Sequence, residues 1–139
     1  MRCIDLFSGI GGFRVGLEQA FPDTIKTIAY CENNERAVES YKAVFNGQSS
    51  QFIADICDAT DQSVSIEDFL ASAALRLKVA KKVKANFPEA ELVVGGFPCQ
   101  PHSLMGNRKG SNDTRGSLVY EIVKLIYSLK PKNFIFENV

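Results

Sequence analysis

The four cysteines of this 139-residue sequence form no C-x-x-C pair, and no apolar run approaches the roughly 20 residues that a membrane-spanning helix needs. The wide spacing of Cys3, Cys31, Cys57 and Cys99 indicates neither a zinc site nor a dense disulfide framework. Met1 leads directly into a strand-like segment without the apolar core of a signal peptide. From these absences we expect a cytoplasmic protein that holds no metal.

An excess of either charge is absent as well. Sixteen Lys and Arg residues stand against sixteen Asp and Glu residues, which gives a net charge of zero. This balance argues against a large, self-sufficient surface for binding phosphates, because nucleic-acid-binding domains usually carry a basic face. We find no internal repeat and no low-complexity segment, and a composition of 45% hydrophobic and 23% charged residues is typical of one globular domain, here residues 1–139.

Short apolar segments alternate with amphipathic segments of helical length. The apolar segments predict five strands, at residues 2–7, 25–30, 51–54, 91–94 and 133–137. The amphipathic segments predict helices over about 12–20, 34–45, 66–85 and 117–129. This alternation is typical of an α/β fold with a doubly wound, mostly parallel sheet, whose ligands bind at the carboxyl ends of the strands.

Residues 61–86 form an apparent insertion between the third and fourth predicted strands. Its helical end is rich in lysine: Lys78, Lys81, Lys82 and Lys84. A solvated helix face accounts for these lysines better than a phosphate-binding role does.

Three glycines directly follow the first predicted strand, in the segment Asp5-Leu6-Phe7-Ser8-Gly9-Ile10-Gly11-Gly12. Glycines at a strand–helix turn let a ligand approach the backbone closely, as in nucleotide-type pockets. The turn is not the dinucleotide fingerprint G-x-G-x-x-G, because Arg14 stands where the third glycine belongs.

Two acidic residues follow the next two predicted strands. Glu32 stands where a carboxylate accepts the hydroxyls of a ribose, and Asp55-Ile56 offers a second acceptor and an apolar wall for an adenine ring. Each acid taken singly is explained equally well by helix capping or by solvation of a loop. In this order after the glycine turn, the set favours an adenosine site.

Cys99 lies between two prolines in a loop that follows a buried strand, a placement that suits a covalent nucleophile. We interpret the other three cysteines as small buried hydrophobic residues. Glu137 ends the last predicted strand among apolar neighbours, beside the strand that leads to Cys99. Partial burial there raises the pKa of a carboxyl group, so we expect Glu137 to hold or share a proton and to assist a substrate nitrogen.

Three segments together resemble the cytosine-C5 DNA methyltransferase family: the glycine turn, Gly96-Phe97-Pro98-Cys99-Gln100 and Glu137-Asn138-Val139. Their order and spacing match the family over the whole chain except residues 61–86. The resemblance implies a Rossmann-like, S-adenosylmethionine-dependent domain that methylates double-stranded DNA, as in a restriction–modification system. It also implies that Cys99 attacks C6 of a flipped cytosine, that Glu137 assists at N3, and that C5 takes the methyl group, leaving S-adenosylhomocysteine.

The resemblance further implies the binding residues. The residues that it implies contact S-adenosylmethionine are Phe7, Ile10, Gly12, Glu32, Asn33, Asp55, Ile56, Pro98 and Leu118. Asn33 departs from the family, since many relatives place an aromatic residue there. The segment 102–115 resembles a mobile catalytic loop, in which Ser103, Arg108 and Lys109 are candidates for DNA phosphate contacts and equally for ordinary solvated residues. His102 fits a packing or phosphate-contacting role better than that of a general base.

Family members continue past Glu-Asn-Val with an arginine motif, a target-recognition domain and a returning C-terminal segment. We therefore expect the chain alone to be weakly active or inactive unless a second polypeptide supplies these parts. A gene fragment, a subunit of a split enzyme and a degenerate remnant all fit the sequence.

Three alternative functions remain open from the sequence. The substrate is tRNA in relatives that share this catalytic core, although Gly96-Phe97-Pro98-Cys99 is closer to the bacterial DNA-modifying branch. A cofactor-binding or regulatory subunit without activity is the second alternative. A dinucleotide oxidoreductase is the third, and both Arg14 and the Cys99 loop argue against it.

Overall fold

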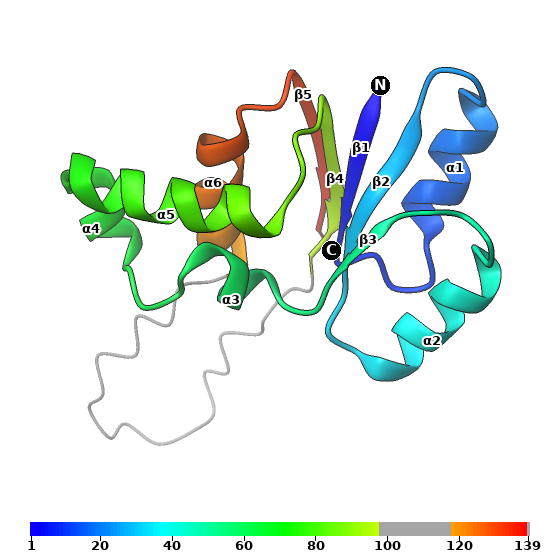
Figure 1. The fold of residues 1–139 in the computed structure, drawn as a ribbon, viewed down its shortest axis with the longest axis horizontal. Coiled ribbons are helices and arrows are strands. Elements are labelled where there is room, and N and C mark those ends of the chain that lie inside the picture. The colour runs from blue at the N-terminus through cyan, green and yellow to red at the C-terminus, as the bar shows by residue number, and fades with distance from the viewer. Residues whose placement is uncertain (98–117, 139) are drawn as a thin grey trace.

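The computed structural model describes residues 1–97 and 118–138 and shows one five-stranded sheet with helices on both faces (Figure 1). The strands are β1 (Arg2–Leu6), β2 (Lys26–Cys31), β3 (Gln51–Ile53), β4 (Leu92–Gly96) and β5 (Asn133–Glu137). They lie in the order β3-β2-β1-β4-β5, and all neighbouring pairs are parallel. The predicted doubly wound α/β fold is confirmed.

The helices fall into two groups, one on each face of the sheet (Figure 1). One face carries α1 (Gly12–Ala20) and α2 (Glu35–Val44); the other carries α3 (Ile56–Thr60), α4 (Ile66–Ala71), α5 (Ala73–Asn86) and α6 (Leu118–Leu129). The change of face accompanies a change of direction: the chain runs outward from β1 to β3, then crosses back to β4 and β5. Right-handed crossovers require this exchange of faces. The carboxyl ends of β1 and β4 therefore lie at the switch point, where ligands bind in such folds.

The main core lies between the sheet and the second group of helices. Fully buried aliphatic side chains of the strands, such as Ile4, Leu6 and Val93, pack there against Val79 and Val83 of α5. Gly95 lets β4 approach β1 closely, because a Cβ atom at this position would lie 2.5 Å from the Leu6 carbonyl oxygen. Within the described residues, no helix is long and apolar enough to cross a membrane.

The insertion after β3 differs from the predicted single helix over 66–85. Ser72 separates α4 from α5: its backbone is extended (φ −116°, ψ 116°), and its hydroxyl accepts a hydrogen bond from the Leu75 amide at 3.3 Å. A serine caps a helix start in this way, which the helical periodicity alone did not reveal. The short helix α3 was not predicted either. The four lysines of α5 are exposed, as expected for a solvated face.

Candidate functional site

The glycine turn between β1 and α1 has an unusual backbone. Phe7 (φ 52°), Gly9 (φ 54°) and Gly11 (φ 94°) all adopt left-handed conformations, which a bulky residue such as phenylalanine rarely does. Gly11 is sterically required, because a Cβ atom there would collide with the ring of Phe45. At Gly9 and Gly12 the corresponding space is open. The turn therefore leaves room above its backbone for a ligand.

Glu32, at the end of β2, is tied to this turn. One carboxylate oxygen accepts a hydrogen bond from the Gly9 amide at 2.8 Å, and the other accepts from the Asn34 amide at 2.8 Å. Glu32 thus holds the turn in place. Each oxygen keeps a second lone pair, so the half-buried carboxylate is still able to accept a hydroxyl of a ligand.

Asp55 follows β3 and caps α3, with its Oδ1 atom accepting from the Cys57 amide at 2.8 Å. Asp55 therefore does cap a helix, which is the ordinary explanation for an acidic residue at this place. It engages one oxygen only, and the next residue, Ile56, is buried with 2% exposure. A polar acceptor and an apolar surface consequently lie side by side.

One pocket gathers most of the residues predicted to bind the cofactor. It is lined by Phe7, Cys31, Glu32, Asn33, Ala54, Asp55, Ile56 and Leu118. Ile10, which is 66% exposed, and Gly12 lie outside this lining, and Pro98 lies outside the described residues. Sequence reasoning missed Cys31 and Ala54, which line the pocket only because they precede predicted residues at two strand ends. A lining that combines two carboxylates with apolar side chains suits a nucleoside.

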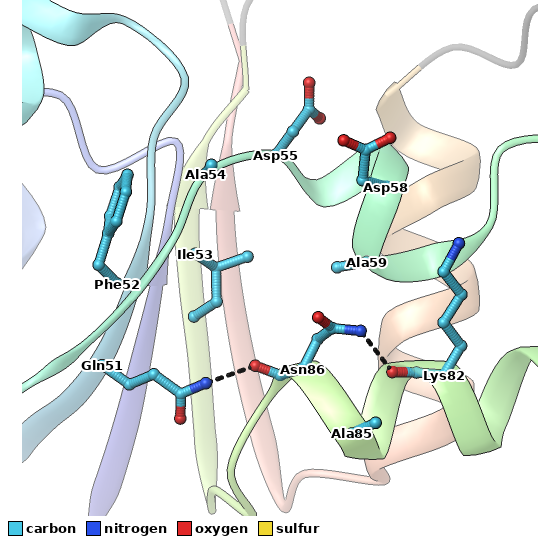
Figure 2. A pocket seen from close by; sticks show the side chains of 10 residues that line it. All are labelled: Gln51, Phe52, Ile53, Ala54, Asp55, Asp58, Ala59, Lys82, Ala85 and Asn86. Atoms are coloured by element: carbon cyan, nitrogen blue, oxygen red, sulfur yellow. Dashed lines mark hydrogen bonds between the residues drawn. The ribbon is translucent and has the colours of Figure 1, made fainter.

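A larger hollow of about 510 Å³ lies next to this pocket, between β3 and the helices α3 and α5 (Figure 2). It shares Ala54 and Asp55 with the pocket, while Lys82 and Asn86 of α5 border it on the opposite side from Phe52 (Figure 2). Apart from Asp55, none of the predicted cofactor residues lines this hollow. We therefore place the candidate site in the smaller pocket.

The strand that carries Glu137 lies beside β4, as predicted. Gly96 and Glu137 are register partners, and Glu137 Oε2 lies 3.5 Å from the position of a Cβ atom at Gly96. The Asn138 side-chain amide donates to the Phe97 carbonyl at 2.9 Å, which joins the two strand ends. The Cys99 side chain itself, with Pro98, His102, Ser103, Arg108 and Lys109, lies outside the described residues.

The expected burial of Glu137 is wrong for this structure. Glu137 is exposed, and so are its neighbours Phe134 (58%) and Ile135 (49%). The reason is that β5 is the outermost strand of the described sheet, so Phe134 and Ile135 border open space, and only Phe136 packs against the core. Flanking residues of apolar type do not bury a carboxylate unless another element covers them.

The three described cysteines behave as structural residues. Cys3 and Cys31 are buried, with exposures of 0% and 3%. Burial raises the pKa of the Cys3 thiol to about 12 and that of Cys57 to about 11, and it raises the pKa of Cys31 as well. Since the thiolate is the nucleophile, none of these three is activated.

Two buried ionisable residues next to the glycine turn, Arg14 and Asp5, were missed by sequence reasoning. Arg14 is 2% exposed, and its guanidinium donates to the Tyr41 hydroxyl at 3.2 Å and lies 4.1 Å from the centre of the Phe45 ring. Asp5 is completely buried, and neither carboxylate oxygen has a hydrogen-bond partner. Burial raises the pKa of Asp5 to about 7, against a smaller opposite effect of Arg14. Neither residue carries a signal in the sequence beyond its place next to the glycines.

Comparison with known proteins gives a match over the whole chain. Residues 1–139 match the sequence profile of the family described as C-5 cytosine-specific DNA methylase. A type II methyltransferase of Neisseria lactamica, M.NlaX, is 35% identical over 139 residues, which are 99% of this chain and 36% of that protein. A DNA-cytosine methyltransferase of Escherichia coli K12 is 34% identical over 99% of this chain and 29% of its own length.

Solved structures give the same fold. A mutant of the DNMT2 protein of Spodoptera frugiperda superposes with a TM-score of 0.59 at 22% identity, over 99% of this chain and 35% of that one. The Dnmt2 methyltransferase of S. pombe gives a TM-score of 0.50 at 21% identity. The chain thus spans about a third of the length of the relatives it matches.

Proposed function

Because the chain belongs to the C-5 cytosine-specific DNA methylase family, we propose that it provides the cofactor-binding and catalytic part of a DNA (cytosine-5) methyltransferase. The observation that carries this proposal is the pocket at the carboxyl ends of β1, β2 and β3, on the β1 side of the switch point, which gathers Phe7, Glu32, Asp55 and Ile56. In the proposed enzyme, the parts found in the remaining length of the relatives act together with this chain on double-stranded DNA.

The residue types of the pocket suit S-adenosylmethionine, which would supply a methyl group from its sulfonium when bound. Open space at Gly9 and Gly12 leaves room for a ligand against the backbone, and the pocket lining combines two carboxylates with apolar side chains. We assign the ribose hydroxyls to Glu32 and the adenine amino group to the second oxygen of Asp55. Ile56 would hold the adenine ring, and the glycine turn would hold the methionine part; the remaining assigned contacts are Phe7, Ile10, Gly12, Asn33, Pro98 and Leu118.

In the proposed reaction, the Cys99 thiolate forms a bond to C6 of a flipped cytosine. The electron pair of the C5–C6 double bond moves toward C5, while Glu137 donates a proton or hydrogen bond at N3. After C5 has taken the methyl group, the C5 proton is lost, the double bond forms again and the Cys99 thiolate leaves. In this chain the Glu137 carboxylate is exposed to water. In the proposed enzyme, the flipped base and the further protein cover it and exclude that water. Ser103, Arg108 and Lys109 are assigned to the DNA phosphates.

The test is a covalent trap. The chain, alone and together with any polypeptide encoded directly downstream, is incubated with tritiated S-adenosylmethionine and DNA that contains 5-fluorocytosine. Fluorine at C5 blocks the final elimination, so an enzyme of this class stays bound to the DNA. We expect an adduct that survives denaturation with the wild type and with Cys57→Ser, and none with Cys99→Ser.

Dependence of the adduct on the second polypeptide would identify a split enzyme. Glu137→Gln is expected to slow adduct formation by about 10² or more, as for loss of a general acid. An adduct with Cys99→Ser would contradict the assignment of the nucleophile. A lack of any adduct in every combination would contradict the catalytic function.

A further inference from the structure

A buried polar cluster, the α3–α6 clasp, lies behind the candidate pocket. It consists of Thr60 at the end of α3 and of Glu121 and Lys124 on α6, with exposures of 0%, 2% and 1%. Lys124 Nζ lies 2.9 Å and 3.0 Å from the two carboxylate oxygens of Glu121. Both charges are therefore paired inside the protein.

The Thr60 hydroxyl connects this ion pair to α3. It lies within hydrogen-bonding distance of Glu121 Oε2 and also 2.8 Å from the Ile56 carbonyl oxygen. A hydroxyl has one proton, and the charged carboxylate is the stronger acceptor of the two. Thr60 thus donates to Glu121, and this bond ties α3 to α6.

Lys124 adds a second connection between the same elements. Its ammonium group donates to the carbonyl oxygen of Asp61, the residue that ends α3, at 3.3 Å. The Asp61 carboxylate in turn pairs with Lys78 of α5 at 3.0 Å. The cluster therefore joins the end of α3 to α6 at two points, with a further link to α5.

The clasp is directly connected to two walls of the pocket. Ile56 begins α3, one turn before Thr60, and Leu118 begins α6, one turn before Glu121. Both Ile56 and Leu118 line the pocket. The hydrogen bond between Thr60 and Glu121 thus connects the two helices that carry these walls.

Stability alone is a poor explanation for charged groups at this place. Burying an ion pair costs hydration free energy, and well-packed apolar residues of similar size are often equally or more stabilising. Polar contacts differ in that they require one particular arrangement of their partners. A short helix such as α3, which has five residues, gains a fixed position from such contacts.

We propose that the α3–α6 clasp is a positioning device for two walls of the cofactor pocket, with Thr60 and Glu121 setting the spacing of Ile56 and Leu118. This inference rests on the proposed function, because it takes the pocket as the site of the cofactor. Thr60, Glu121 and Lys124 touch no ligand in this arrangement and act through the two wall residues.

The test compares Thr60→Val, which replaces the hydroxyl by a methyl group of similar size, with Thr60→Ser, which keeps the hydroxyl. Val83→Ala serves as the control, because it opens the same core at a fully buried position that does not line the pocket. For each full chain, calorimetry measures the Kd of S-adenosylhomocysteine, and thermal unfolding measures stability. Hydrogen exchange follows the amides of residues 55–57 and 118–121.

We expect Thr60→Val to weaken S-adenosylhomocysteine binding about tenfold, or about 1.4 kcal/mol. The Kd values of Thr60→Ser and Val83→Ala for S-adenosylhomocysteine are expected to stay within about twofold of the wild-type value. Val83→Ala should nevertheless lower the unfolding temperature at least as much as Thr60→Val does. Exchange at 55–57 and 118–121 should accelerate in Thr60→Val and not in Val83→Ala.

Unchanged binding in Thr60→Val, or an equal loss in Val83→Ala, would overturn the inference. If the wild type binds no S-adenosylhomocysteine, the proposed cofactor site is rejected. Hydrogen exchange then tests separately whether the clasp positions the two wall segments. Faster exchange at the two wall segments in Thr60→Val alone then supports the positioning role. Equal exchange in Thr60→Val and Val83→Ala rejects it.

Discussion

Asp5 combines complete burial with the lack of a hydrogen-bond partner for either carboxylate oxygen. Burial raises its pKa from 3.8 to about 7; Glu32 and Glu18 add to this rise, and Arg14 opposes it. Because the pKa is higher in the folded than in the unfolded chain, the folded chain binds more protons between about pH 4 and pH 7. The contribution of Asp5 to stability therefore falls as the pH rises through this window.

Replacement of Asp5 by Asn should remove this dependence, since an amide of the same size does not ionise. We expect Asp5→Asn to be more stable than the wild type at pH 8, by up to about 4 kcal/mol, and to differ little at pH 4. Urea unfolding at a series of pH values measures the difference. A difference that does not depend on pH would show that packing, not ionisation, dominates at this position.

The described cysteines lead to a second prediction at this scale. With a thiol pKa of about 11, Cys57 is almost entirely protonated at pH 8, and Cys3 and Cys31 are buried in addition. In the folded chain, we expect iodoacetamide to modify these three at least about tenfold more slowly than free cysteine. Peptide mapping by mass spectrometry measures the rates, and modification in denaturant is the control. Modification of Cys57 at the rate of free cysteine would contradict the assigned structural role.

At the scale of single elements, the N-cap of α1 and its interior each hold a glycine, and the two positions have opposite requirements. Gly11 caps the helix in a left-handed conformation (φ 94°) and lies against Phe45. Gly16 lies in the helix interior, where a Cβ atom would meet no other atom within 4 Å. Position 11 therefore requires glycine, whereas glycine at position 16 makes the helix less stable.

We therefore expect Gly11→Ala to lower the free energy of unfolding by at least about 2 kcal/mol, through backbone strain and the collision with Phe45. Gly16→Ala should raise it by about 0.5–1 kcal/mol, because alanine is the better helix former. Urea unfolding of both variants provides the comparison. Equal effects of the two substitutions would contradict the positive φ angle at Gly11.

At the scale of the whole molecule, the pocket and the turn predict which ligand stabilises the fold. Arg14 replaces the third glycine of the dinucleotide fingerprint, and its guanidinium is held inside the protein by Tyr41 and Ser50. It is thus unable to turn toward a pyrophosphate. The carboxylates of Glu32 and Asp55 in the pocket do not favour two further negative charges either.

We expect S-adenosylhomocysteine at 100 times its Kd to raise the free energy of unfolding by about 2.7 kcal/mol. NAD at the same concentration should leave the free energy of unfolding unchanged. Thermal unfolding with either ligand measures both effects. Stabilisation by NAD of the same size would instead favour the dinucleotide oxidoreductase.

Local patterns in the sequence were sufficient to predict the order of the elements and the family. Hydrophobic periodicity is a local property, so the five strands and the helices α1, α2 and α6 were predicted within one or two residues of their observed ends. The glycine turn, Cys99 and Glu137 are likewise recognised locally, from residue types at fixed spacing. The break at Ser72 and the short helix α3 were not predicted, because in each case a single capping side chain determines where the helix begins.

Only the tertiary structure decided which of these residues meet and which are covered. The parallel sheet brings Phe7, Glu32, Asp55 and Leu118 to one pocket from four separate segments, whereas it leaves Glu137 exposed at its outermost strand. The buried charges of Asp5, Arg14, Glu121 and Lys124 look like ordinary surface residues in the sequence. Burial and pairing depend on neighbours that are distant along the chain, and a local pattern contains no information about them.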